Sequence, residues 1–149
     1  MAQQDRSRDI AVGSVYDQID AIYRRAVARS RRINAPLTQV EQSLLAFIGG
    51  NPGCRATDIA SAFSLNRSTV SRQIHALAEL GLVVEGDSDS QPRRGRALSV
   101  TEEGADRLKR SLAIHREAVR NRLDGWSEAE LRDFAAALER FNGAKDEGQ

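Results

Sequence analysis

The sequence is poor in the residues from which catalytic and metal sites are built. Its 149 residues include only one cysteine and two histidines, and it contains no glycine-rich phosphate loop and no nucleophile elbow. Histidine, cysteine and carboxylate side chains nowhere occur at metal-ligand spacing, so neither a structural zinc nor another cofactor is expected. These absences predict a protein that is not an enzyme.

The single cysteine, Cys54, cannot form a disulfide within the chain. Cysteine is among the most buried residue types, so a buried thiol is the expected state. The alternative is a redox role, which the adjacent Arg55 favours because a nearby cation lowers the pKa of a thiol.

Long apolar runs are also absent. No segment approaches the roughly 18–20 consecutive apolar residues of a membrane helix, and the N-terminus lacks the apolar core of a signal peptide. We therefore predict a cytoplasmic protein with no membrane contact. The net charge is only +1 and the pI is about 8.0, so overall charge does not indicate a nucleic-acid partner. The basic residues are instead concentrated locally, within residues 24–32, 67–72 and 93–96.

A helix-turn-helix pattern occupies residues 55–83. A short helix with one apolar face is followed by a polar turn, in which Asn66 is suited to cap a second helix over residues 67–80. On a helical wheel, the apolar residues Val70, Ile74 and Leu77 of this second helix fall on one side. The other side is small, polar and partly cationic, with Ser68, Thr69, Arg72 and His75. Because Ser and Thr can bond base edges or phosphates and Arg can bind guanine at two points, this face predicts contact with a DNA major groove.

A β-hairpin with a basic tip is predicted after this helix. Gly81 stands where a left-handed C-terminal residue is expected, and residues 82–84 and 96–100 have β-prone patterns. The tip between them carries Arg93, Arg94 and Arg96. Arginines at such a tip can enter a narrow minor groove, where the negative potential is strongest in A·T-rich DNA.

The remaining sequence predicts helices on both sides of this unit. Apolar residues at helical spacing indicate helices over residues 14–31 and 101–123. Capping boxes beginning at Thr38 and Ser127 indicate two more. Apolar stripes on the first and last helices are most simply buried against a second copy of the chain, although packing within one chain would give the same pattern.

These motifs together resemble the MarR family of winged-helix transcriptional regulators. The matching residues are Ala60, the run 66–72, Leu77-x-x-x-Gly81-Leu82-Val83, and Arg93-Arg94-Gly95 leading to residues 98–104. The resemblance covers nearly the whole chain. It implies a mainly α fold with a small β-hairpin wing, and a homodimer whose terminal helices interlock. The corresponding division is a flexible tail at residues 1–13, a dimerisation region at 14–35 and 102–143, a DNA-binding lobe at 36–101 and a flexible tail at 144–149.

The resemblance also implies roles for particular residues. Arg94 matches the family's wing arginine, and Ser68, Ser71 and Arg72 match positions that face DNA. The sequence departs from the family at Pro92, where an Asp usually braces the wing. Asp87 or Asp89 are the candidates to replace it, and the sequence does not decide between them.

The predicted function is therefore a dimeric, sequence-specific DNA-binding regulator of the repressor type that binds a palindromic operator in double-stranded DNA. The predicted DNA-binding residues are Arg67, Ser68, Thr69, Ser71, Arg72, His75, Arg93, Arg94 and Arg96; for His75, simple exposure is the alternative to phosphate contact. The resemblance further implies a small aromatic effector that weakens DNA binding, for which Tyr16, Tyr23 and Arg24 are candidate ligands.

Two other functions compete with this one. A winged-helix module that binds protein would carry exposed aromatic and apolar anchors, which the outer helix face and the wing lack. A small-molecule sensor or enzyme in which DNA is secondary would carry a catalytic constellation, which the sequence lacks.

Overall fold

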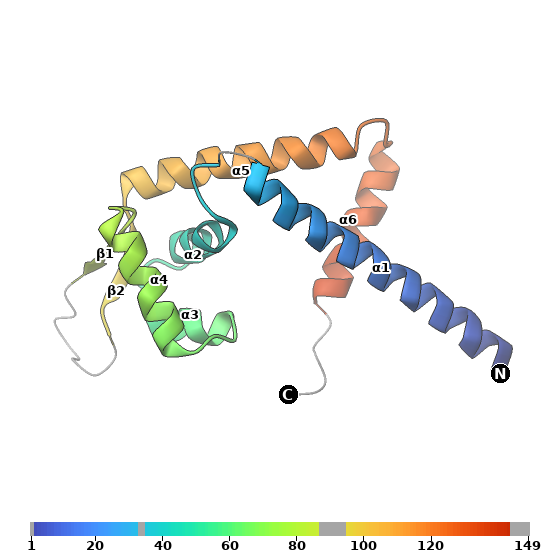
Figure 1. The fold of residues 1–149 in the computed structure, drawn as a ribbon, viewed down its shortest axis with the longest axis horizontal. Helices are drawn as coiled ribbons and strands as arrows, with labels where there is room; N and C mark the ends of the chain where they lie inside the picture. The colour runs from blue at the N-terminus through green and yellow to red at the C-terminus, as the bar shows by residue number, and fades with distance from the viewer. Residues whose placement is uncertain (1, 33–34, 87–94, 144–149) are drawn as a thin grey trace. The chain divides into compact units, whose positions relative to one another are not determined.

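The structure is a computed structural model that describes residues 2–32, 35–86 and 95–143 (Figure 1). These residues form six helices and a two-stranded antiparallel hairpin, which confirms the predicted mainly helical fold with a β wing. In chain order the elements are α1 (Ala2–Arg32), α2 (Gln39–Gly50), α3 (Ala56–Ala62), α4 (Arg67–Glu79), β1 (Val83–Gly86), β2 (Ala97–Val100), α5 (Glu102–Arg122) and α6 (Glu128–Asn142). The chain divides into two compact units, Met1–Ser111 and Leu112–Gln149.

Helix α1 corrects one sequence prediction. Residues 2–13, expected to be part of a flexible tail, are helical and continuous with the predicted helix. The segment contains no proline, and its Ala, Gln and Arg residues are good helix formers. Asp5 lies in the first turn, where its charge complements the positive end of the helix dipole. The prediction began later because the apolar stripe is dense only after Val12. The other predicted tail, 144–149, lies outside the described residues.

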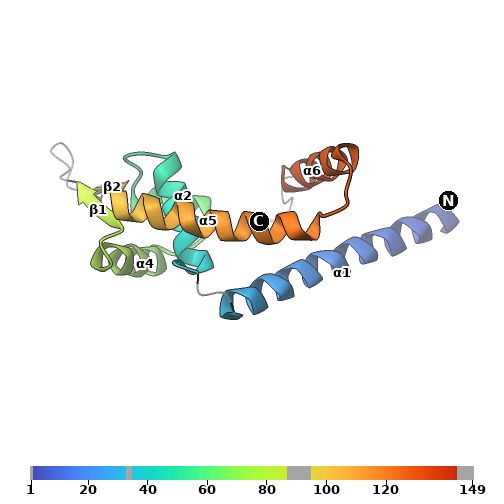
Figure 2. The ribbon, with the colours of Figure 1, turned by 90° about the horizontal axis from the view of Figure 1, so that it is seen from above.

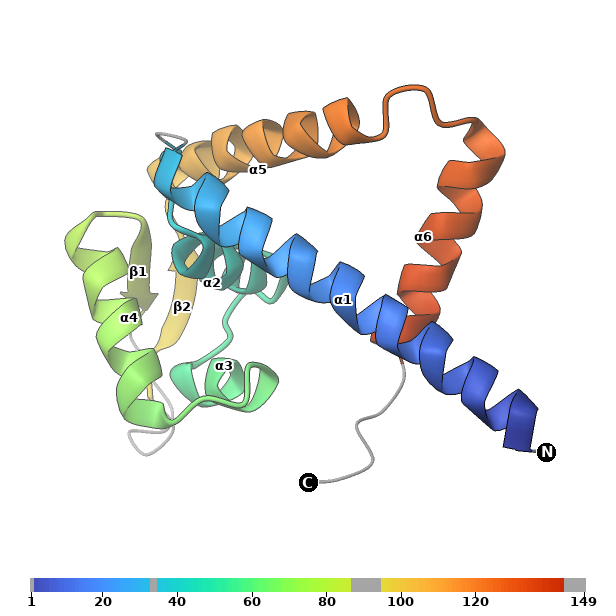
Figure 3. The ribbon, with the colours of Figure 1, turned by 45° about the vertical axis from the view of Figure 1, so that its right-hand side comes forward.

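The core of the first unit lies between α2, α3, α4 and the hairpin, which gather together in the views of Figures 2 and 3. Its most deeply buried apolar side chains are Leu45, Ile48, Ile59, Val70, Leu77, Leu82, Val83 and Leu98. The predicted capping box starts α2, with the Thr38 backbone N–H donating to Glu41 Oε2 at 2.7 Å.

The hairpin is joined to the core by its backbone. Val83 pairs with Val100 at one end and Gly86 with Ala97 at the other. On its second side β2 is tied to the segment before α3, because the Leu98 N–H donates to the Cys54 carbonyl at 2.8 Å. The wing therefore begins from a fixed base.

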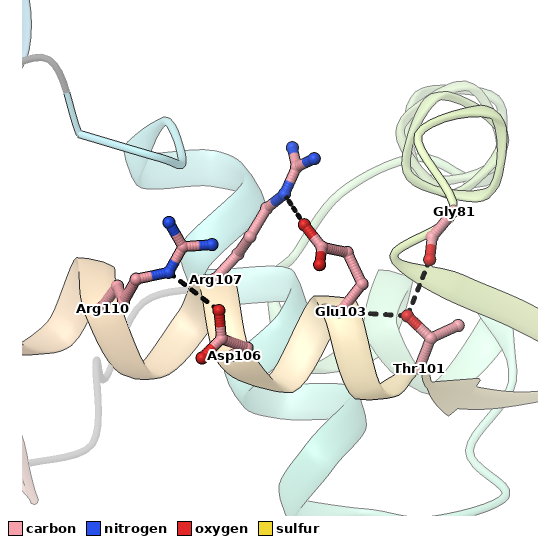
Figure 4. Close-up of polar contacts among 7 residues, drawn as sticks. Gly81, Thr101, Glu103, Asp106, Arg107 and Arg110 are labelled. Carbon is pink, nitrogen blue, oxygen red and sulfur yellow. Dashed lines mark hydrogen bonds and ion pairs between the residues drawn. The ribbon is translucent and has the colours of Figure 1, made fainter.

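Helix α5 starts in close contact with the end of α4. The Thr101 hydroxyl donates to the Gly81 carbonyl at 2.7 Å and accepts from the Gly104 N–H at 3.0 Å (Figure 4). Gly81 has a φ of 71°, as predicted for a left-handed residue after a helix. On the outer side of α5, Arg107 pairs with Glu103 at 2.6 Å and Arg110 with Asp106 at 2.8 Å.

In the second unit, the end of α5 is followed by a turn at Gly125 and by α6. The predicted capping box is present, with the Ser127 N–H donating to Glu130 Oε2 at 2.8 Å. Trp126 and Phe134 form a ring contact with centroids 5.5 Å apart. No residue of α6 is buried in the single chain.

Candidate nucleic-acid interface

The turn between α3 and α4 fixes where α4 begins. Ser64 has a φ of 52°, and it is the one non-glycine residue with positive φ in the described part of the chain. The Leu65 N–H donates back to the Ala60 carbonyl at 2.9 Å. Asn66 then caps α4 as predicted, its Oδ1 accepting from the Thr69 N–H at 2.8 Å. A side-chain cap of this kind satisfies one of the free amide groups at a helix start.

Helix α4 has two chemically different faces. Val70, Ile74 and Leu77 are buried in the core, at 0%, 3% and 1% exposure. The predicted DNA-facing residues Arg67, Ser68, Ser71, Arg72 and His75 are all exposed, whereas Thr69 is half-buried. The structure therefore brings most of the predicted helix residues onto one accessible polar face and leaves Thr69 at its edge.

The side chains of this face differ in whether they already have a hydrogen-bond or ion-pair partner. The Ser68 hydroxyl donates to Asn66 Oδ1 at 2.9 Å, so its oxygen remains available chiefly as an acceptor. His75 Nε2 lies 3.4 Å from Glu79 Oε1, an ion pair when the imidazole is protonated. Among the described residues, Arg67, Ser71 and Arg72 have no side-chain partner. Their donors are available to a base edge or a phosphate.

At the base of the wing, Arg96 forms an ion pair that the sequence analysis missed. Its Nη1 lies 3.4 Å from Glu85 Oε2 across the hairpin. The hairpin register contained the signal, because Glu85 is opposite Leu98 and Gly86 is opposite Ala97, next to Arg96. Both side chains are substantially exposed, so the pair stabilises the fold little, but it orients Arg96.

The remaining wing predictions fall beyond the described residues. Arg93, Arg94, Pro92 and the two candidate braces, Asp87 and Asp89, all lie in residues 87–94. Their roles stay predictions.

Cys54 is buried, with 7% of its surface exposed, as expected. Burial raises the pKa of its thiol above the ordinary value, and the nearby Asp58 carboxylate raises it further. The argument that Arg55 lowers this pKa is therefore wrong, because desolvation and a negative charge outweigh the neighbouring cation. The thiol is held in its unreactive, protonated form.

The three candidate effector residues lie on α1. Tyr16 and Tyr23 are 70% and 68% exposed, and Arg24 Nη1 pairs with Asp20 at 3.0 Å. A recess of about 460 Å³ is present elsewhere, where α5 meets α6, and it is lined by Arg116, Val119, Arg120, Leu123, Asp124, Gly125, Trp126 and Leu131. None of the three candidates lines that recess.

Neither a metal-holding cluster nor a membrane-spanning helix is found in the described residues. They contain no group of three or more His, Cys, Asp and Glu side chains arranged to hold a metal ion. Over the same residues, every helix is too short or too polar to cross a membrane.

Comparison with known proteins finds one family model that matches part of the chain. Residues 36–94 match the sequence model of the MarR family. No curated protein matched the sequence.

Solved structures share the fold over most of their length. A MarR family protein from Bacillus stearothermophilus aligns with a TM-score of 0.78 at 17% identity, covering 90% of this chain and 94% of that one. Staphylococcus aureus MarR in complex with salicylate and kanamycin aligns with a TM-score of 0.77 at 13% identity, covering 89% and 91%. Streptococcus pneumoniae FabT in complex with DNA aligns with a TM-score of 0.72 at 17% identity, covering 87% and 93%. At such identities the likeness establishes the fold.

Proposed function

We propose that this chain is a member of the MarR family and a dimeric, sequence-specific DNA-binding transcriptional regulator of the repressor type. The observation that carries the proposal is the exposed polar face of α4, which lies opposite a fully buried apolar face. A helix held in this way by a winged-helix core can enter a major groove without losing its packing. FabT, which shares the fold, has been solved in complex with DNA.

The DNA contact proposed for each residue follows from the chemistry of its exposed group. Arg72 presents a guanidinium that can donate two hydrogen bonds to guanine, and Ser71 can bond either a base edge or a phosphate. Arg67, the first residue of α4, and His75, about one turn before its end, are proposed to contact phosphates. Arg94, by its match to the family's wing arginine, is proposed to enter the minor groove, with Arg93 and Arg96 beside it on the phosphates.

Dimerisation is proposed from the apolar surfaces of the outer helices. On α1, Val15, Ile19 and Ile22 are 52%, 40% and 51% exposed. On α6, Phe134 and Leu138 are 39% and 41% exposed. Exposed apolar stripes of this length are unusual on a monomer, and a second copy offers the same stripes for burial. The dimerisation region is accordingly proposed to be 14–35 and 102–143, extended by the first turns of α1, around the lobe 36–101.

A small aromatic acid is proposed as the effector. The S. aureus MarR structure holds salicylate, and a phenolic acid needs a cation for its carboxylate and apolar walls for its ring. Arg24, Tyr16 and Tyr23 supply such groups on α1, and a dimer partner would have to enclose them. The proposed consequence of binding is weaker DNA affinity.

The test combines DNA selection with a matched pair of arginine variants. The purified protein is expected to select imperfect palindromes from a random pool, with half-site centres about 34–36 Å apart, and to sediment as a dimer. Arg72→Ala should weaken binding by about 1–3 kcal/mol and relax preference at one base per half-site. Arg132→Ala, which removes the same charge from the exposed surface of α6, should leave base preference unchanged.

Three outcomes would contradict parts of the proposal. Selection of no common sequence would favour the alternative, a winged-helix module that binds protein, although α4 presents no aromatic anchor on its exposed face. If Arg72→Ala lowered the affinity equally for all DNA sequences, Arg72 would contact a phosphate rather than a base. A monomer that binds a single half-site tightly would refute the dimeric mode.

A further inference from the structure

One hydrogen bond joins side chains distant in sequence inside the first unit. The Ser111 hydroxyl on α5 donates to Gln42 Oε1 on α2 at 2.7 Å. Ser111 is 0% exposed and Gln42 is 9% exposed. Over the described residues, these two are the buried polar side chains. The family motifs that identified the lobe include neither of them.

A buried polar pair constrains geometry more strongly than apolar contact. Leaving either group without its partner costs its desolvation energy, so the pair is stable only where donor and acceptor meet. Apolar side chains in the same place would let α5 slide over α2 with little loss of stability. The bond therefore specifies the position of α5 on α2.

Ser111 is the last of three points that hold α5 on the lobe. The first is Thr101, whose hydroxyl bonds the Gly81 carbonyl (Figure 4). The second is Gly104, which lies against the Leu82 backbone with no room for a Cβ. At 1.5 Å per residue, Thr101 and Ser111 lie about 15 Å apart along the helix axis. Contacts at both ends of this stretch fix the direction of α5 on the lobe.

We propose that the Gln42–Ser111 bond is a positioning contact that sets the direction in which α5 leaves the DNA-reading lobe. In a dimer, α5 connects each lobe to the dimerisation helices, and its direction then determines the separation of the two recognition helices. The bond thereby determines which half-site spacing the protein accepts. This inference rests on the proposed dimeric DNA-binding function.

The experiment compares binding to operators that differ only in half-site spacing. The selected palindrome is lengthened or shortened at its centre one base pair at a time, and a single half-site is included. The double variant Gln42→Met/Ser111→Ala removes both polar groups at little change in volume, which keeps the core apolar and the fold intact. Ser43→Ala is the control, since its exposed hydroxyl bonds the Gln39 carbonyl of the same helix at 2.9 Å.

The wild type and Ser43→Ala should show the same sharp spacing optimum. In the double variant, the preference for that optimum over other spacings should fall about three- to tenfold, the range that one net hydrogen bond supports. Its affinity for a single half-site should be unchanged. An unchanged spacing profile in the double variant would overturn the inference while leaving the proposed function standing. Spacing-independent binding by the wild type would overturn both.

A second measurement needs no DNA. Spin labels at Ser61→Cys on α3 and Asn121→Cys near the end of α5 are both on exposed positions, and Cys54→Ala removes the native thiol. Labelled chains are diluted with unlabelled protein so that each dimer carries at most one labelled chain. The distance distribution should be broader with Gln42→Met/Ser111→Ala than without it. Equal widths would contradict the inference, whichever way DNA binding behaves.

Discussion

The close approach of α5 to Leu82 predicts that replacing Gly104 even by alanine destabilises the protein. Gly104 is buried in the first turn of α5. A Cβ at this position would overlap the Leu82 carbonyl oxygen, and it would lie 2.9 Å from Val100 Cγ1 and 3.1 Å from the Leu82 carbonyl carbon. The main obstacle is backbone, which cannot rotate away as a flexible side chain can.

The size of the effect follows from three terms. Overpacking a buried site costs about 1–3 kcal/mol. Moving the Leu82 carbonyl also disturbs the bond that it accepts from the Thr101 N–H at 3.0 Å, a net loss of about 0.5–1.5 kcal/mol. Alanine is about 1 kcal/mol better than glycine inside a helix, which offsets part of this. We expect Gly104→Ala to destabilise the protein by about 1–3 kcal/mol.

Urea unfolding at a fixed protein concentration measures this change, because dimerisation would make the midpoint depend on concentration. Gly50→Ala is the matched control, since Gly50 lies at the end of α2 and a Cβ there would meet nothing within 4 Å. The control should be neutral or slightly stabilising. If Gly104→Ala proved as stable as Gly50→Ala, the close approach of α5 to Leu82 would be refuted.

Three further predictions concern caps and titrating groups. Asn66→Ala removes the cap on the Thr69 N–H and should lower stability by about 0.5–2 kcal/mol in urea unfolding, whereas Asn66→Asp should restore most of it. The raised pKa of Cys54 means that its contribution to stability is complete below the ordinary thiol pKa of 9.0 and is lost as pH rises through the folded value; Cys54→Ala should abolish this alkaline decline. The pKa of Glu130 is lowered by the Ser127 backbone N–H and then by its hydroxyl, so the Glu130 contribution is present above 4.5 and is lost as pH falls through the folded value. Glu130→Gln should flatten that acid limb, and an unchanged limb would contradict the capping role.

The elements of the lobe were predictable because local rules and the apolar pattern agreed. Asn66 is a preferred cap and stands directly before an amphipathic segment, so the start of α4 followed from one residue. Gly81 marked the end of α4 for the same kind of reason, since its positive φ favours glycine. The exposed polar face of α4 needed only helical periodicity.

What the sequence did not predict depends on contacts between distant segments. Gln42 and Ser111 are 69 positions apart, and each alone is an ordinary helical polar residue. Nothing local says that Gly104 faces the Leu82 carbonyl rather than solvent. Glu85 gives no signal of its own in the sequence, because only the pairing of β1 with β2 brings it near Arg96. The N-terminal start of α1 was predicted too late for a different reason: polar residues with good helix propensity give no periodic signal.

The residues of the proposed DNA interface should not contribute equally to base specificity, because several of them already have partners within the chain. A side chain that already has a partner must exchange that interaction for one with DNA, so its net contribution is the difference between the two. Arg96 would have to leave Glu85, His75 would have to leave Glu79, and Ser68 already uses its proton on Asn66. Arg67 and Arg72 have no such partner among the described residues, and both guanidiniums are bidentate donors, but Arg72 lies near the middle of α4 whereas Arg67 is its first residue. Base discrimination by α4 should therefore be concentrated at Arg72, with the paired residues contributing chiefly to placement on the phosphates.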